Sequence, residues 1–262
     1  MGIPLLEEKD LFGFLLVFLR TLSMIAFIPI FGERVVPAQV KGILAFLLAF
    51  VLYPFLGREI VPGEVPGLVA LLLGMSGEVL IGMVAGIMVR FIFAGVQFAG
   101  EMIGFQMGFS IANVIDPVSS LQVSLISQLQ YYMAFLLFLA LDGHHGFLLA
   151  LAESFRTVPP LAFSFSGGLM EMILETSKGL FILAVKLSAP VIAVLVFTHV
   201  ALGLVARTVP QINVFIVGFP IQIALGLLFL ALSSGFVLAA LESDFLGFSG
   251  VLRQAFRLMG TP

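Results

Sequence analysis

The sequence predicts an all-α fold: a polytopic membrane-protein-type helical bundle with broken helices and helical hairpins. Hydrophobic residues make up 61% of the 262 residues and charged residues only 10%, whereas soluble domains are about 45–50% apolar and about 25% charged. Several apolar runs approach or exceed the roughly 20 residues that a helix needs to cross a bilayer. The runs also lack the strict alternation of strands in membrane β-barrels. We therefore expect nearly all of the regular structure to be helical.

Three apolar elements are predicted in the first part of the chain. The run at 11–30 is long enough to span a bilayer and has Pro29 near its end. The run at 43–56 is shorter, and Pro54 closes it, because proline interrupts a helix. The run at 68–99 is the longest of the three. Turn-forming residues indicate loops between these elements, at 32–37 and 57–67.

Three further apolar elements are predicted in the second part. The run at 131–152 is treated as one element, although it contains the polar sequence Asp-Gly-His-His at 142–145. The run at 180–206 contains Pro190, and the run at 212–241 contains Pro220. Turn chemistry separates these elements from one another by loops at 157–168 and 207–211.

Four charged residues lie inside the apolar runs: Arg20, Glu78, Arg90 and Lys186. A charge at the centre of a bilayer costs on the order of 2.5–3.5 kcal/mol on insertion scales. Two interpretations stay open. The charges could extend from helix ends to the membrane surface, which suits Arg20 and Lys186 best, or the helices could face other subunits that supply partner charges. Neither alternate set of loops is richer in Lys and Arg, so the loop charges do not predict which side of the membrane each loop faces.

The composition offers little support for enzymatic chemistry. The chain has no cysteine, which excludes disulfides, thiolate metal sites and thiol nucleophiles. It lacks the HExxH motif of zinc proteases and the phosphate-binding loop of nucleotide enzymes. Its basic residues are scattered and the net charge is −3, so no nucleic-acid footprint is present. We predict no catalytic residue, no cofactor, no metal and no nucleic-acid partner.

The cluster of Asp142, His144 and His145 is the one candidate for catalysis or metal binding. No further histidine is close in sequence, because His199 lies in a separate apolar run. A polar turn or helix end at a membrane boundary is the favoured interpretation, and the role of the two histidines stays open.

The stretch 100–117, GEMIGFQMGFSIANVIDP, differs most from a lipid-facing helix. Gly100, Gly104 and Gly108 recur at every fourth residue, a spacing that lets two helix backbones approach closely. The chain then becomes polar and reaches Pro117, which breaks a helix. Irregular backbone at membrane depth is tolerated only inside protein or along a water-filled path. The pattern predicts a gate, and the Gly82–Gly86 pair predicts close helix packing one stretch earlier.

Four stretches together resemble one family. They are RTLSMIAFIPIFGERVVPAQVK from residue 20, GFQMGFSIANVIDPVSS from 104, LLFLALDGHHGFLLALAESFRTVP from 136, and ALGLVARTVPQINVFIVGFPIQIALGL from 201. These stretches are similar to the FliR/SctT family of flagellar and type III secretion export-gate proteins. The resemblance runs from residue 11 to residue 241. The forms of 142–144 and 209–220 favour the flagellar branch.

The resemblance implies a core subunit of the flagellar type III protein export gate, in the bacterial inner membrane at the flagellar basal body. Its implied partners are FliP-like and FliQ-like subunits in a larger helical hetero-oligomer, FlhB-like and FlhA-like export proteins, unfolded export substrates and membrane lipid. Residues 1–168 would form a FliP-like portion and residues 169–262 a FliQ-like helical hairpin, within one continuous integral domain.

The family also has a loop that closes the export channel, and residues 106–122 match it. We expect Met107, Phe109 and Ile111 to face the pore axis, while Gly104 and Gly108 give the backbone freedom to move. The expected gate residues are Gln106, Met107, Gly108, Phe109, Ser110, Ile111, Val114, Ile115, Asp116 and Pro117.

The tip of the FliQ-like hairpin is expected at the cytoplasmic entrance, although a plain helix–helix turn is an equal alternative. Its residues are Arg207, Pro210, Gln211 and Asn213. Two other functions compete with the export gate. A small secondary transporter would place a substrate site near Arg90, Asp116 and Lys186, and a structural membrane scaffold would need no polar gate.

Overall fold

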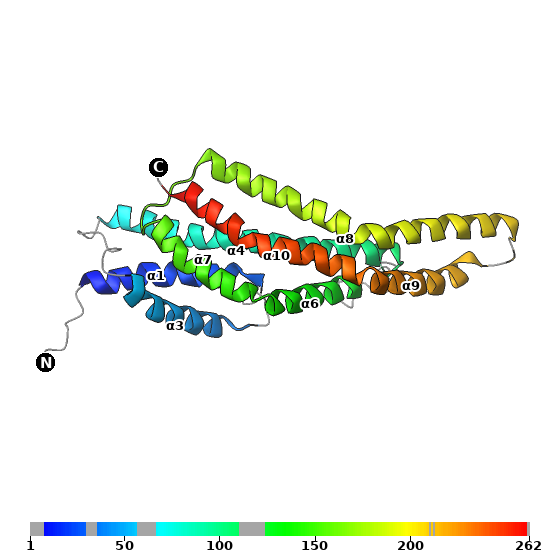
Figure 1. Ribbon diagram of the computed structural model, residues 1–262, viewed down its shortest axis with the longest axis horizontal. Coiled ribbons are helices and arrows are strands. Elements are labelled where there is room, and N and C mark those ends of the chain that lie inside the picture. The colour runs from blue at the N-terminus through cyan, green and yellow to red at the C-terminus, as the bar shows by residue number, and fades with distance from the viewer. Residues whose placement is uncertain are drawn as a thin grey trace. The chain divides into compact units, whose positions relative to one another are not determined.

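The computed structural model describes residues 8–29, 36–56, 67–109, 124–209, 211 and 213–260, and every regular element among them is an α-helix. This confirms the predicted all-α class (Figure 1). Five of the helices are long and apolar enough to cross a membrane, or up to six if the bent pair α6–α7 is one span. The helices are α1 (Glu8–Phe27), α3 (Ala38–Leu56), α4 (Leu68–Gln106), α6 (Leu125–Ala140), α7 (Gly143–Thr157), α8 (Gly167–Thr208), α9 (Val214–Leu232) and α10 (Ser234–Met259).

Two of the predicted elements are each divided into two helices. The run at 131–152 breaks between α6 and α7, whose axes are bent by 66°. The break is at Asp142, which has a left-handed backbone with φ 54°. The run at 212–241 divides into α9 and α10 at Ser233. Predicting single elements here was wrong, because an apolar run keeps its mean hydropathy across a break of one or two residues.

The chain forms two compact units, which are described separately. Unit 1 contains residues 1–91, 142–177 and 246–262, and unit 2 contains residues 92–141 and 178–245. Helices α4, α8 and α10 contribute residues to both units.

In unit 1, α1 packs against α3 and against α4. Phe14 and Phe46 meet edge to face with their ring centroids 5.3 Å apart. Gly82 and Gly86 lie on the α4 surface that faces α1: a Cβ on Gly82 would contact Ser23 and reach within 2.7 Å of the Met24 backbone nitrogen. Side chains at these glycines would therefore push the two helices apart.

A buried ion pair joins α1 to α4 in unit 1. Arg20 Nε donates a hydrogen bond to Glu78 Oε2 at 2.6 Å, and both side chains are 0% exposed. Arg20 Nη1 also donates to the Val158 carbonyl oxygen at 2.9 Å and to Ser154 Oγ at 3.3 Å. The Leu161 backbone N–H donates to Glu78 Oε1 at 3.0 Å. The network therefore fixes α1, α4, α7 and the start of the loop before α8.

This pair corrects both expectations for Arg20. Its side chain does not extend to a surface, and its partner charge comes from the same chain. Arg20 and Glu78 are 58 positions apart in sequence, so nothing in the local pattern reveals that they meet. Arg90 and Lys186 differ from this pair, since both are exposed.

Unit 2 has an aromatic core. The ring of Phe93 on α4 lies 5.7 Å from Tyr131, 5.6 Å from Phe138 and 5.4 Å from Phe245, measured between centroids. Gly100 allows α6 to approach α4, because a Cβ there would lie 2.8 Å from the Ser127 backbone nitrogen. Ser127 Oγ in turn donates to the Gln97 carbonyl oxygen at 2.9 Å.

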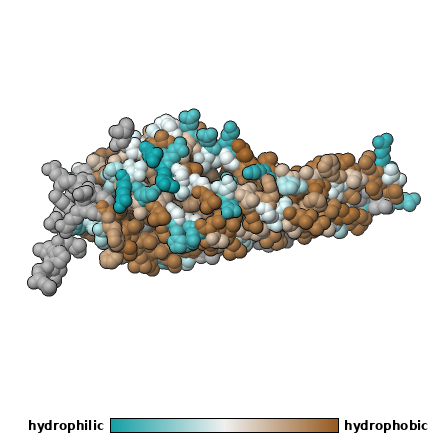
Figure 2. Space-filling view, viewed as in Figure 1, coloured by the Kyte–Doolittle hydropathy of each residue, from teal (hydrophilic) through white to brown (hydrophobic). Residues whose placement is uncertain are grey.

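The outer surfaces of α8 and α9 in unit 2 are strongly apolar. Phe197 is 75% exposed, Leu204 62% and Ile216 71%, and this part of the surface is mostly brown in Figure 2. Exposed apolar surface of this extent needs lipid or protein to cover it.

Candidate functional site

Four of the predicted gate residues lie in the described part of the chain. Gln106 ends α4, and Met107, Gly108 and Phe109 follow it in a turn. We call residues 106–122 the gate segment. Six predicted gate residues lie outside the described residues: Ser110, Ile111, Val114, Ile115, Asp116 and Pro117.

The last turn of α4 ends in a Schellman motif. The Phe109 N–H donates to the Gly104 carbonyl oxygen at 3.1 Å, and the Gly108 N–H donates to the Phe105 carbonyl oxygen at 3.0 Å. These are the two hydrogen bonds that define the motif, which places a left-handed residue at the position of Gly108. Gly108 has φ +90°, a conformation that is strained for any side chain with a Cβ. The start of the gate segment is therefore fixed in direction.

Met107 is buried in the core of unit 2. Its exposure is 0%, and it packs in a cluster with Ile103, Ile126, Val191 and Leu195. Met107 therefore has no exposed surface with which to face a pore axis in this structure. The partly buried side chain of Phe109 packs against the same cluster.

Helix α9 packs against this turn: its partly buried Ile223, Phe229 and Leu230 lie against the Met107 cluster, and two further residues approach the turn closely. A Cβ on Gly226 would lie 2.7 Å from Met107 Cγ and 2.8 Å from Met107 Sδ, so the thioether chain rests directly on the α9 backbone. A Cβ on Gly108 would lie 2.6 Å from Phe219 Cε1. Gly226 and Phe219 are seven residues apart, about two helical turns, and so share one face of α9.

Ser124, the first described residue after the gate segment, contacts the same turn of α4. A Cβ on Gly104 would collide with Ser124 Oγ and lie 3.2 Å from Ser124 Cβ, and Ser124 directly precedes α6. Because Gly104 has no side chain, Ser124 packs directly against it. The carbonyl oxygen of Gly104 accepts the hydrogen bond from Phe109. We call Gly104, Met107, Gly108 and their contacts the anchor of the gate segment.

The anchor changes the interpretation of its glycines. We expected Gly104 and Gly108 to give the backbone freedom, and in this structure both hold defined positions. Gly104 is helical and tightly packed, and Gly108 occupies a fixed left-handed position in two hydrogen bonds. Both glycines are needed for a defined geometry, because a Cβ would clash at either position.

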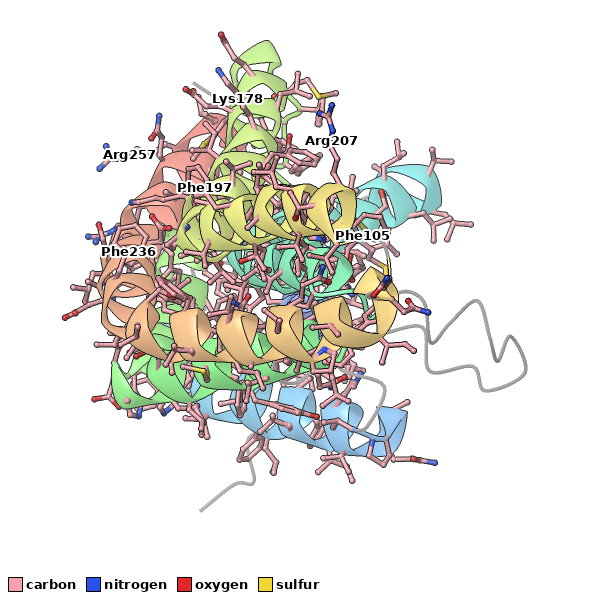
Figure 3. The ribbon with its side chains drawn as sticks, turned by 90° about the vertical axis from the view of Figure 1, so that its right-hand side faces the viewer. Phe105, Lys178, Phe197, Arg207, Phe236 and Arg257 are labelled. Atoms are coloured by element: carbon pink, nitrogen blue, oxygen red, sulfur yellow. The ribbon has the colours of Figure 1, made fainter. Side chains whose placement is uncertain are left out.

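Gln106 has a polar neighbour on α8. Its Nε2 lies 3.5 Å from His199 Nδ1, while His199 Nδ1 lies 2.8 Å from the Leu195 carbonyl oxygen. His199 is exposed on α8. The side chains of Phe105 and Phe197, both labelled in Figure 3, are 70% and 75% exposed, so the outer surface beside the anchor is aromatic.

The predicted hairpin tip lies between α8 and α9. Arg207 is in the last turn of α8 and is exposed, as are Gln211 and Asn213. Pro210 lies outside the described residues. Asn213 caps the start of α9, since its Oδ1 accepts from the Ile216 N–H at 3.4 Å. Polar groups thus gather at the turn, as both alternatives for the tip require.

Comparisons with known proteins identify the family. The family model of bacterial export proteins, family 1, matches residues 11–247. The chain is 38% identical to the flagellar biosynthetic protein FliR of Bacillus subtilis (strain 168), covering 96% of this chain and 97% of that protein. It is 35% identical to FliR of Escherichia coli (strain K12), over 81% and 80% of the two chains. For FliR of Aquifex aeolicus (strain VF5) the identity is 31%, over 98% of both chains.

The chain belongs to the bacterial export proteins of family 1. This export protein is a component of the flagellar export apparatus, with a membrane location in keeping with its apolar helices. Its family supports the export function over the secondary transporter. Of the residues expected for the transporter site, Asp116 lies outside the described residues, and Arg90 and Lys186 are exposed.

The cluster at the α6–α7 break is the one described group of this export protein that could hold a metal ion. Ligand atoms of Asp142, His144 and His145 lie within 4.8 Å of one another. His145 Nδ1 is 3.1 Å from Asp142 Oδ1, with side chains 64% and 72% exposed. The Asp142 carbonyl oxygen accepts from the His145 and Gly146 N–H groups. The cluster forms a polar helix end at the start of α7, as predicted.

Sequence reasoning missed the α9 half of the anchor. Gly218 and Gly226 are the two fully buried residues among the described side chains of α9, 216–232, and a Cβ on Gly218 would lie 3.3 Å from Leu202 of α8. The two glycines are eight residues apart, which puts them near one face of a helix. That spacing was a usable signal for a close contact, although it could not reveal that Met107 is the residue in contact with Gly226.

Proposed function

We propose that the gate segment closes the flagellar export channel and that the export protein has a structural role without catalysis. The observation that carries this proposal is the anchor. Phe109 and Ser124, the described residues on either side of residues 110–123, both contact Gly104, the first through a hydrogen bond and the second through packing. A segment held at both ends can occupy an opening or leave it while the helices that carry it stay in place.

The residue types of the segment suit a seal against ions. Ile111, Val114 and Ile115 are apolar, and a hydrophobic constriction excludes ions because it loses its water. A closed state that is only a few kcal/mol more stable than the open state can be shifted by a partner or a substrate. Asp116 and Pro117 follow the apolar residues and would fix where the segment turns back.

The partners are part of the proposal. We propose that FliP-like and FliQ-like subunits cover the exposed apolar faces of α3 and α8, with FlhB-like and FlhA-like proteins joining the assembly in the bacterial inner membrane. The exposure of Phe50, 64%, and of Phe197, 75%, supports large contacts outside the chain. Residues 1–168 would be the FliP-like portion and 169–262 the FliQ-like hairpin. The hairpin tip with Arg207 would then face the cytoplasmic entrance and the arriving unfolded substrates.

Deletion of residues 110–114 tests the gate. We expect the variant to assemble, because the anchor lies outside the deletion, and to let ions leak across the membrane of cells that are not exporting. Ion leak is measured in cells and in vesicles that contain the purified complex. A deletion variant that assembles and stays as impermeable as the unaltered complex would exclude residues 110–114 from the seal.

A further inference from the structure

Three polar side chains meet on the surface of unit 1 at the start of α7. Ligand atoms of Asp142, His144 and His145 all lie within 4.8 Å of one another. Asp142 has a left-handed backbone with φ 54°, and its Oδ1 lies 3.1 Å from His145 Nδ1 in the first turn of the helix. The rings of His144 and His145 lie 4.1 Å apart between centroids. One carboxylate and two imidazoles are therefore brought together within the segment 142–145.

The backbone under this cluster is held in place, whereas its side chains are accessible. Phe147 of the same helix turn is buried, and a Cβ on Gly146 would lie 3.3 Å from Phe248 Cζ of α10. The side chains of Asp142 and His145 are 72% and 64% exposed. A helix fixed by packing is a good base for a binding site, and exposed side chains can rotate to adjust their distances to an ion.

The distances suit a small divalent ion. Zinc binds imidazole nitrogen and carboxylate oxygen at about 2.0–2.2 Å in a tetrahedral arrangement, so two ligand atoms of one zinc ion lie roughly 3.3–3.6 Å apart. The 3.1 Å between His145 Nδ1 and Asp142 Oδ1 is close to that separation. Nδ1 of His144 is buried and has no hydrogen-bond partner among the described residues, so this ring is not committed to another polar group through that atom.

The three groups also select the kind of ion. Two imidazoles with one carboxylate favour Zn²⁺ and related transition-metal ions over Ca²⁺ and Mg²⁺, which take mainly oxygen ligands. The negative charge of Asp142 offsets the positive end of the α7 dipole, which would otherwise oppose a cation. The chain has no cysteine and three histidines, so the cluster holds two of the three imidazoles available to a metal ion.

We propose that Asp142, His144 and His145 form a zinc site with three protein ligands and a remaining position open to water. The bound ion would stabilise the left-handed turn at Asp142 and take no part in secretion itself. The sequence alone predicts no metal here, because the segment lacks the spacing of a zinc-protease motif. We depart from that prediction because the left-handed residue places the carboxylate beside His145. The site is independent of the gate segment.

Zinc binding by the assembled export complex, purified without a histidine tag, tests the site. His145 is exposed, so His145→Ala should leave assembly intact. Loss of this ligand should weaken zinc binding by about 10–100-fold or more, since even groups that only orient a ligand contribute that much. Zinc affinity is measured by titration calorimetry, and retained zinc by elemental analysis after dialysis. Equal zinc affinity and content in the unaltered and His145→Ala complexes would overturn the proposal.

His199→Ala is the matched control. His199 is the remaining histidine of the chain and lies exposed on α8. The complex that carries this variant should bind zinc as the unaltered complex does. An equal loss of zinc binding in His145→Ala and His199→Ala would mean adventitious binding to surface histidines, and the site would be rejected.

Two further measurements address the ligands and the effect of the ion. X-ray absorption of zinc bound to the unaltered complex should show nitrogen and oxygen ligands at about 2.0–2.2 Å, with scattering from two imidazole rings. Zinc should raise the midpoint of thermal unfolding, because an ion that binds only the folded state stabilises it, and a chelator should reverse this. The chelated unaltered and His145→Ala complexes should unfold alike. Scattering from fewer than two rings, or an equal zinc-induced shift in His145→Ala, would overturn the proposal.

Discussion

In unit 1, a buried ion pair joins α4 to α1 beside the close-packed Gly82 and Gly86, whereas the end of α4 in unit 2 meets its neighbours through glycines and a methionine. Arg20 and Glu78 are 0% exposed and share polar contacts with α7 and the loop after it. Gly104, Met107 and Gly108 meet α6 and α9 by shape, with backbone hydrogen bonds only inside the Schellman turn.

The two kinds of junction differ in how they can fail. A buried charge that loses its partner is strongly unfavourable, so the junction in unit 1 has one acceptable arrangement. Separating an apolar contact between a glycine and a methionine costs less than this, since it leaves no charge or donor unpaired. The ion-pair junction therefore tolerates one arrangement only, whereas the contacts of Met107 tolerate more than one.

The largest effect is expected from breaking the ion pair. Arg20→Leu or Glu78→Leu alone should lower the stability of the export protein by about 3–5 kcal/mol, because the remaining charge is left buried and unpaired. The double variant should recover much of this loss, since both charges are then gone. Thermal unfolding and the yield of the assembled complex measure the effect.

Arg90→Leu is the control for this prediction. Arg90 lies on α4 in unit 1 and is exposed, so its loss should leave stability nearly unchanged. If Arg20→Leu is as mild as Arg90→Leu, the pair does not fix unit 1 and the contrast between the two units disappears.

A smaller effect is expected at Gly108 in unit 2. Gly108→Ala must adopt φ +90°, which costs an L-residue about 1–2 kcal/mol, and its Cβ would lie 2.6 Å from Phe219 Cε1. Since the strain is confined to the anchor, we expect a complete complex with a raised ion leak. Leak in vesicles and thermal unfolding are the measurements.

Gly203→Ala provides the comparison, because Gly203 lies within α8 with nothing within 4 Å of its ideal Cβ. Alanine there should be neutral or slightly stabilising, since it favours the helix. Gly108→Ala and Gly203→Ala with equal leaks would show that the Schellman turn is not needed for a closed gate.

The sequence predicts where the helices lie along the chain but misses their breaks and the contacts between them. Apolar runs indicate each helix, because mean hydropathy is a local property of the chain. The breaks at Asp142 and Ser233 are missed, since one or two residues barely change that mean. The partner of Arg20 is missed because Glu78 is 58 positions away, and the Met107–Gly226 contact is missed because two distant helices must already be packed.

The candidate site shows the same limit. The spacing of Gly100, Gly104 and Gly108 predicts close packing of backbones at the end of α4. It cannot distinguish a mobile backbone from a fixed one, because glycine serves both. Only the φ of Gly108 and the contacts of Gly104 decide for a fixed turn.

The smallest effect is expected at Asp142, which belongs to unit 1 and takes part in neither the ion pair nor the glycine–methionine contacts. Asp142→Gly removes an exposed contact with His145, and exposed pairs contribute about 0–1 kcal/mol. It also relieves a left-handed backbone with φ 54°, which glycine adopts without strain. The two effects oppose each other, so thermal unfolding and secretion should stay close to those of the unaltered protein.

Asp142→Val is the matched variant, because a β-branched residue at positive φ should destabilise the α6–α7 break while removing the same contact. Equal and severe loss of secretion in both variants would mean that the Asp142 carboxylate itself is needed, and the cluster with His144 and His145 would then be more than a helix end.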